Sequence, residues 1–83
     1  MHTPMKLKVD EIKPGISYSE RVAYILNSEG VREEVFVSER SVVDGKLLSV
    51  HIMDDGDTSL VELPRETSSG AWRVWVHKDR VEF

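Results

Sequence analysis

Apolar residues fall at every second position along most of this chain of 83 residues, in short runs separated by turn signals. A period of two places side chains alternately on the two faces of a β-strand, whereas a helix needs a period of about 3.6, which no segment sustains. Turns spaced in this way are typical of a small barrel or sandwich. The pattern therefore predicts an all-β domain.

Six runs carry the alternation, at residues 5–9, 21–26, 31–38, 46–53, 60–63 and 71–76. Turns between runs are indicated by Pro14-Gly15, Asp44-Gly45 and Asp55-Gly56. The run at residues 46–53 is the strongest strand. One of its faces is uniformly apolar and the other is mixed: the first carries Leu48, Val50 and Ile52, the second Leu47, Ser49, His51 and Met53.

The last third of the chain has the clearest order of elements. The alternating segments TSLVEL and AWRVWV are joined by the loop PRETSSG, which predicts a hairpin, and the turn HKDR and the run VEF follow. From about residue 25 this succession resembles an SH3-like small barrel, in which a central hairpin precedes one tight helical turn and a closing strand. The resemblance implies an all-β, SH3-like small barrel of five or six antiparallel strands with one short 3-10 turn.

The segments LVELPRETSSGAWRVWV, HKDR and VEF carry the resemblance, which is one of architecture. The chain lacks the ALYDY-like opening, the paired tryptophans of the central strand and the proline-containing closing motif of peptide-binding SH3 domains. No peptide-groove residue is therefore transferred from that family. An OB-like barrel and a short two-sheet roll satisfy the same pattern, and fold alone does not assign a function.

The length allows a single domain, residues 1–83, with residues 1–14 expected to form a peripheral strand or arm. A chain this short buries a limited share of its surface, so a partner or a second copy would add burial. The absence of cysteine excludes disulfides and thiolate metal sites. The N-terminal segment lacks the apolar core of a signal peptide and no apolar run could cross a bilayer, so we expect a cytoplasmic protein without membrane contact.

One strand places an aromatic residue between basic ones. Within the last long run, Arg73, Trp75 and His77 alternate with valines and so point the same way, while Trp72 is expected to face the core. An exposed tryptophan beside cations can stack on a nucleobase or anchor a protein partner.

An alternative accounts for the same tryptophan without any partner. Trp75 would then lie beneath the N-terminal segment, capped by Met5 or Leu7, with Arg73 stacked on its ring.

Several basic residues would suit a patch that follows a phosphate backbone: Lys6, Lys8, Arg65, Arg73, Lys78 and Arg80. The whole chain nevertheless has a net charge of −4 and an isoelectric point near 5.3, whereas nucleic-acid binders are usually strongly basic. Charges that keep edge strands from pairing explain the same residues, and antiparallel pairing is expected to mix them with acids.

Residues suited to catalysis or metal binding are few. His2, His51 and His77 are the only histidines and form no HxxxH or HExxH pair. The acidic turn at residues 54–57 lacks the twelve-residue spacing and final glutamate of an EF-type loop, and no serine lies in a nucleophile elbow. We therefore expect no enzyme activity, cofactor, metal or small-molecule substrate.

Together these patterns predict a small non-enzymatic binding module. We expect protein–protein interaction or self-association, such as a dimer, through an exposed β face, with unpaired edges at the N-terminal run favouring an added strand. The alternative is a nucleic-acid-binding barrel that uses a Trp/Arg/Lys surface. The candidate binding surface comprises Arg73, Trp75, His77, Lys78, Arg80, His51 and Met53.

Overall fold

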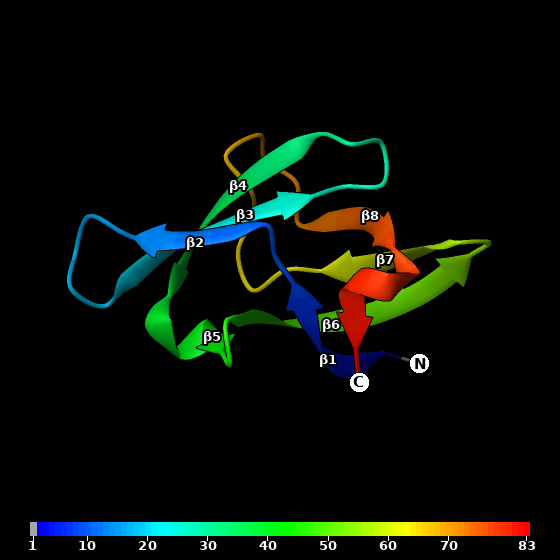
Figure 1. Ribbon diagram of the computed structural model, residues 1–83, viewed down its shortest axis with the longest axis horizontal. Helices are drawn as coiled ribbons and strands as arrows, with labels where there is room; N and C mark the ends of the chain where they lie inside the picture. Colours follow the sequence, from blue (N-terminus) through cyan, green and yellow to red (C-terminus); the bar gives the residue numbers. More distant parts are fainter. Residues whose placement is uncertain (1) are drawn as a thin grey trace.

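The computed structural model describes residues 2–83 and consists, over that range, of nine β-strands and two single-turn 3-10 helices (Figure 1). The strands are β1 (Thr3–Lys8), β2 (Glu11–Pro14), β3 (Glu20–Leu26), β4 (Arg32–Ser38), β5 (Val42–Val43), β6 (Lys46–Asp55), β7 (Thr58–Glu62), β8 (Arg73–His77) and β9 (Val81–Glu82). The 3-10 turns are η1 (Glu39–Ser41) and η2 (Lys78–Arg80). The all-β class is confirmed.

The strands form two antiparallel sheets. Sheet A contains six strands, in the order β8-β7-β6-β1-β9 with β5 paired to one end of β6. Sheet B contains the other three, in the order β2-β3-β4. The hydrogen-bonded ladders do not close into a barrel, although one isolated bridge joins Val35 of β4 to Thr67 in the β7–β8 loop.

Each of the six runs with a period of two overlaps a strand, and the hairpin expected in the last third is formed by β7 and β8. The elements β2, β5 and η1 were not predicted, so the structure has more strands than the five or six expected and a second 3-10 turn. The turn between β5 and β6 is the expected Asp-Gly turn. Asp44 and Gly45 both have positive φ angles, 55° and 73°, as a type I′ turn requires.

The N-terminal segment forms β1 in the interior of sheet A. Leu7 lies opposite Leu47 of β6 on one side and Val81 of β9 on the other. Met5 and Leu7 are buried, at 5% and 0% exposure. The expectation of unpaired edges at the N-terminal run is therefore wrong for Lys6 and Leu7, which have a strand on both sides, whereas residues 3–5 are paired with β6 alone.

The side of β6 that packs in the core is the mixed one. Leu47 is fully buried, and Ser49 is 7% exposed with its hydroxyl donating to the carbonyl oxygen of Leu47 at 3.3 Å. Because that hydroxyl has a partner, its burial is tolerated. Leu48, on the uniformly apolar face, is 40% exposed. Alternation identifies two faces, and the pairing with Met5 and Leu7 of β1 decides which one points inward.

A β-bulge divides β6 after His51. The register shifts between His51, which lies opposite Val61, and Met53, which lies opposite Leu60. Val61 is fully buried, so His51 is on the inner side of sheet A, whereas Met53 shares the outer side with Leu60. The face that the sequence assigns jointly to Leu47, His51 and Met53 is therefore split between the two sides of the sheet.

The core lies between the inner sides of the two sheets. Its buried apolar side chains are Met5, Leu7, Leu47, Val61, Leu63, Val74 and Val76 around sheet A, and Ala23, Ile25, Val35 and Val37 in sheet B. Because both sheets use one side for this core, the other side of each is left to solvent or to a partner.

Candidate functional site

Three apolar side chains form a row across the outer side of sheet A. The register places Trp75 of β8 opposite Leu60 of β7, and Leu60 opposite Met53 of β6. Side chains directly opposite each other in antiparallel strands lie on the same side of the sheet, with Cβ atoms about 4.5–5.5 Å apart. We call this row of Trp75, Leu60 and Met53 the Trp75 face.

The Trp75 face points away from the core. Val74 and Val76, the neighbours of Trp75 along β8, are 7% and 0% exposed, so Trp75 must point to the opposite side. The exposed fractions are 36% for Trp75 and 49% for Met53, and Leu60 is half-buried between them. Three adjacent apolar side chains thus meet water in the isolated chain, which is typical of a contact surface.

Two of the basic residues predicted for this surface are paired with acids, and one of these pairs lies beside the Trp75 face. Arg73 Nε lies 3.1 Å from Glu62 Oε1, across from β8 to β7. Lys78 Nζ lies 4.0 Å from Asp54 Oδ2, on the inner side of the sheet, because Asp54 lies opposite the buried Ser59. The mixing of opposite charges expected from antiparallel pairing is therefore present around this row.

Asp54 holds a small polar cluster near the end of β6. Its Oδ1 accepts a hydrogen bond from Ser59 Oγ at 2.6 Å and lies 2.7 Å from His51 Nε2. These bonds, that of Ser59 foremost, hold the pKa of Asp54 below its usual value. Since serine and imidazole bind the same carboxylate oxygen, the imidazole does not lie between serine and acid as a nucleophile–base–acid relay requires. The cluster joins β6 to β7 rather than activating Ser59.

The structure brings only part of the predicted surface together. The predicted residues on the outer side of sheet A are Met53, Arg73, Trp75 and His77. Lys78 and Arg80 lie on η2, directly after β8. His51 lies on the inner side of β6, where its ring meets that of Phe83 edge-on with centroids 5.3 Å apart. His51 is therefore separated from the Trp75 face by the sheet itself.

Two expectations about the tryptophans are wrong. Trp75 is not capped by Met5 or Leu7, because those side chains face the core and β1 is separated from β8 by β6 and β7. Trp72 does not enter the core but is 53% exposed. The strand begins at Arg73, so the alternation that was used to orient Trp72 does not extend to it.

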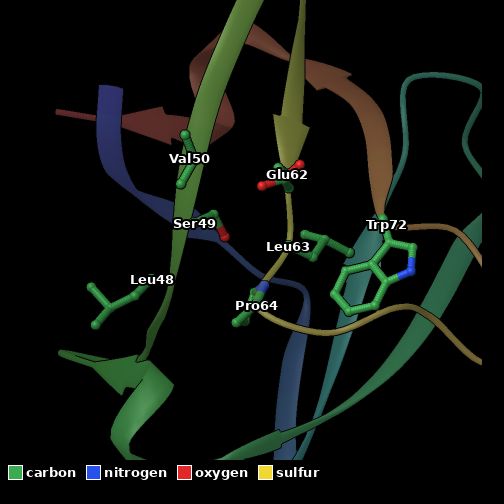
Figure 2. A pocket seen from close by; sticks show the side chains of 7 residues that line it. All are labelled: Leu48, Ser49, Val50, Glu62, Leu63, Pro64 and Trp72. Carbon is green, nitrogen blue, oxygen red and sulfur yellow. The ribbon is translucent and has the colours of Figure 1, made fainter. Parts of the chain in front are cut away.

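A shallow depression of about 400 Å³ separates Trp72 from β6 (Figure 2). It exists because β7 ends before Pro64, which has no N–H with which to continue the ladder. The pairing of β6 with β5 stops at Leu47 and its pairing with β7 starts at Val50, which leaves a gap in between. Figure 2 shows Leu48 on one side of Pro64 and the indole ring of Trp72 on the other.

Among residues 2–83, no three His, Cys, Asp or Glu side chains are grouped so as to hold a metal ion, and no helix is long and apolar enough to span a membrane. No family model, curated protein or solved structure matches this chain.

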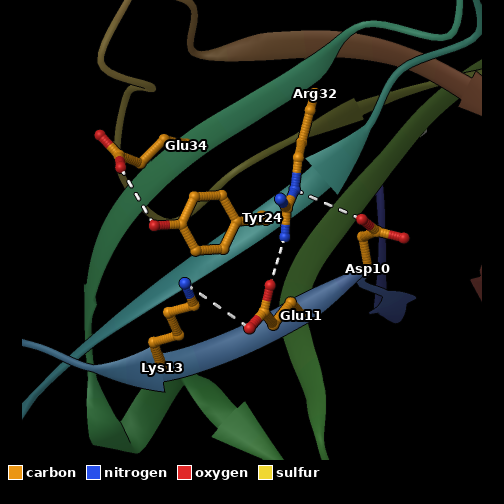
Figure 3. A network of polar contacts seen from close by, with 6 residues as sticks. All are labelled: Asp10, Glu11, Lys13, Tyr24, Arg32 and Glu34. Atoms are coloured by element: carbon orange, nitrogen blue, oxygen red, sulfur yellow. Dashed lines mark hydrogen bonds and ion pairs between the residues drawn. The ribbon is translucent and has the colours of Figure 1, made fainter.

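The outer side of sheet B carries an aromatic residue in a different setting (Figure 3). The guanidinium of Arg32 lies 4.2 Å from the ring centre of Tyr24, and Lys13 Nζ lies 5.5 Å from it. The Tyr24 hydroxyl is 3.3 Å from Glu34 Oε2, and Arg32 also pairs with Glu11. Charged groups of its own chain, themselves paired, therefore cover this tyrosine.

Several exposed apolar residues were not among the predicted surface residues. Leu60 became part of the Trp75 face only through the register of β6, β7 and β8, which no local pattern reveals. Ile16 and Tyr18, which are 95% and 94% exposed, had a signal in the sequence. They directly follow the Pro14-Gly15 turn, where bulky apolar residues have no strand to bury them.

Proposed function

We propose that this protein is a non-enzymatic binding module and that its Trp75 face contacts another protein. The observation that carries the proposal is the row itself, in which tryptophan, leucine and methionine lie side by side on the outer side of sheet A. Aromatic residues and methionine are enriched at protein interfaces, and tryptophan is among the residues whose loss weakens binding most. The ion pair of Arg73 with Glu62 would form part of the polar rim.

A protein suits this surface better than a nucleic acid does. Binding to a phosphate backbone gains its free energy when cations of the protein replace counterions. Here Arg73 and Lys78 already neutralise carboxylates, and the chain as a whole has a net charge of −4. Nucleic-acid binding is the competing outcome of the test below.

We also propose that the two sheets form an opened relative of the SH3-like small barrel. The support is the order of elements in the last third, where the hairpin β7–β8 is followed by η2 and the short β9, as the resemblance implies. In this arrangement β1 occupies the position between β6 and β9.

The test compares immobilised wild-type protein with Trp75→Ser as bait in an extract of the cells that produce it. Val43→Ser is the matched control, because Val43 has the same exposed fraction of 36% but lies on β5, away from the row. We expect a protein that is retained by the wild type and by Val43→Ser and is lost with Trp75→Ser. Near-identical circular dichroism spectra of the three baits would show that all are folded.

Two results would contradict the proposal. Equal retention by all three baits would remove the Trp75 face from the interaction. Retention that disappears after nuclease treatment, and that falls as salt is raised, would assign the surface to a nucleic acid instead.

A further inference from the structure

The most exposed apolar side chains of the described chain lie at the tip of the β2–β3 hairpin. Ile16 is 95% and Tyr18 94% exposed. The tip, residues 15–19, projects at one end of the longest dimension of the molecule, which measures 38 Å, and is the loop at the far left of Figure 1. We call it the finger. Exposure of two large apolar side chains to water is unfavourable in free energy, and burial against a partner would remove this exposure.

The finger is held in one conformation by hydrogen bonds. The amides of Gly15 and Ile16 donate to the carbonyl oxygen and to Oε1 of Glu20, at 2.8 and 3.0 Å. Arg21 Nη1 donates to the carbonyl oxygen of Tyr18 at 3.0 Å. A Cβ on Gly15 would lie 2.8 Å from the carbonyl carbon of Glu20, so the turn also requires glycine for close packing. A surface formed in advance loses little conformational entropy on binding.

The same chain carries a matching pair of hollows. The depression beside Trp72 and a second one of about 340 Å³, lined by Pro4 and Phe83, both include Leu48 and Ser49 in their walls. We call the two together the Leu48 groove. The two hollows lie side by side because they share Leu48 and Ser49. Ile16 and Tyr18, at positions i and i+2 of the turn, are likewise neighbours. The walls of the hollows are mainly apolar, as a site for isoleucine and tyrosine requires.

We propose that the finger of one copy inserts Ile16 and Tyr18 into the Leu48 groove of a second copy, and that the second copy returns the contact to make a two-fold symmetric dimer. A reciprocal contact of this kind is isologous and closed. Each tyrosine buries about 150–250 Å², and two fingers with their grooves bring the total to the order of 1,200 Å² found in specific interfaces.

The charges of the finger favour a protein groove over a lipid surface. Its base carries two acids and two bases, Glu11, Lys13, Glu20 and Arg21, which cancel. Two apolar side chains without a net positive charge give only weak and reversible attachment to a membrane. The groove is likewise balanced, because its rim residues Glu62 and Glu82 are paired with Arg73 and Lys46. The contact is separate from the proposed function, because the Leu48 groove adjoins the Trp75 face on the outer side of sheet A but includes none of its three residues.

Sedimentation velocity across a range of concentrations tests the dimer. We expect the wild type to dimerise and the double variant Ile16→Ser/Tyr18→Ser to raise the dissociation constant by about 100-fold or more, as loss of an interface anchor does. Since both side chains are almost fully exposed, the double variant keeps the fold. Val31→Ser is the control, because Val31 is 51% exposed in the turn at the opposite end of β3. It should dimerise like the wild type.

The groove is tested by Leu48→Glu and by mixing. Leu48→Glu alone should be monomeric, since it places a charge between the two hollows. An equal mixture of Leu48→Glu with Ile16→Ser/Tyr18→Ser should recover part of the dimer, because one intact finger and one intact groove remain. Salt should not weaken the wild-type dimer, as added ions screen the repulsion between two copies of charge −4.

Other outcomes would overturn the proposal. A wild type that stays monomeric at the highest concentration, or a double variant that dimerises as well as the wild type, excludes the finger as a dimer contact. Dimerisation lost in Trp75→Ser but kept in the double variant would place self-association on the Trp75 face. Monomers that bind anionic vesicles through Tyr18 would assign the finger to a lipid surface.

Discussion

Tyr24 lies in the central strand of sheet B and Trp75 in an edge strand of sheet A, and the two residues differ in what covers them. Each lies within a strand and points away from the core. Tyr24 lies under Arg32 and Lys13 and contacts Glu34 through its hydroxyl. Trp75 has no cation over its ring among the described residues, and its cross-strand neighbour is Leu60. An outward aromatic residue that is covered by its own chain stabilises the fold, whereas an uncovered one is available to a partner.

The difference comes from the residues across the strands. Tyr24 has Glu11 on β2 and Glu34 on β4 directly opposite. Glu11 pairs with both cations, and Glu34 accepts the hydrogen bond of the Tyr24 hydroxyl. Around Trp75 the acid and base, Glu62 and Arg73, pair with each other one row away. The cations paired with acids thus lie over the ring of Tyr24, whereas the ion pair near Trp75 lies to the side of its ring.

The largest expected effect is that Tyr24→Ala destabilises the fold more than Trp75→Ala does. Loss of the tyrosine removes a half-buried ring together with its cation and hydroxyl contacts, which we expect to cost about 2–3 kcal/mol. The corresponding loss at Trp75 is expected to be about 1 kcal/mol, mostly contact with Leu60. Urea unfolding of both variants measures the difference. A larger loss for Trp75→Ala would show that Trp75 belongs to the stabilising structure.

Arg32→Met should have a smaller effect, of about 1 kcal/mol. The change removes the cation above Tyr24 and the ion pairs with Asp10 and Glu11. Lys13→Met is the matched control, since Lys13 lies farther from the ring and should cost less. The difference between variants should shrink at high salt, because the ion pairs are partly exposed. Equal effects of the two variants would contradict the special position of Arg32.

Tyr24→Phe isolates the hydroxyl and should cost about 0.5 kcal/mol. The ring keeps its contacts with the cations, and only the bond to Glu34 is lost. Thermal unfolding monitored by circular dichroism would resolve the change from Tyr24→Ala. A loss as large as that of Tyr24→Ala would mean that the hydroxyl, and not the covered ring, provides the stability.

The smallest effect concerns the pH dependence of sheet B. The hydrogen bond from Arg32 holds the pKa of Glu11 below its usual value in the folded protein. The resulting stabilisation is present at neutral pH and is lost as the pH falls from the ordinary glutamate pKa through the lowered folded value. Arg32→Met should therefore show a shallower loss of stability in acid than the wild type. Parallel pH curves, measured by urea unfolding, would contradict this role of the pair.

Much of the fold was accessible from the sequence because strands leave a local signal. The period of two located all six longer strands, and Asp44-Gly45 located a hairpin turn. The short β2 and β5 were missed because each has at most four residues, too few for a period to show. The inward side of β6 depended on its pairing with β1, which is distant in sequence.

The residues of the candidate site were harder to predict from the sequence, since they depend on the register between strands. The alternation correctly turned Trp75 and Arg73 to the same side but placed Met53 with His51, because no local signal announced the bulge between them. Trp72 was oriented by extending β8 one residue too far toward its N-terminus. A shift of one residue moves a side chain to the other face of a sheet, so errors of this size decide which residues form the site.

The most direct test of the account is site-specific photo-cross-linking in the cells that produce the protein. A photoreactive phenylalanine analogue would replace Met53 in the Trp75 face or Lys13 beside Tyr24, both of which are exposed. We expect position 53 to capture a protein other than a second copy of this chain and position 13 to capture no such protein. A partner captured from position 13 alone would contradict this expectation, because the covered side of sheet B would then be the contact surface.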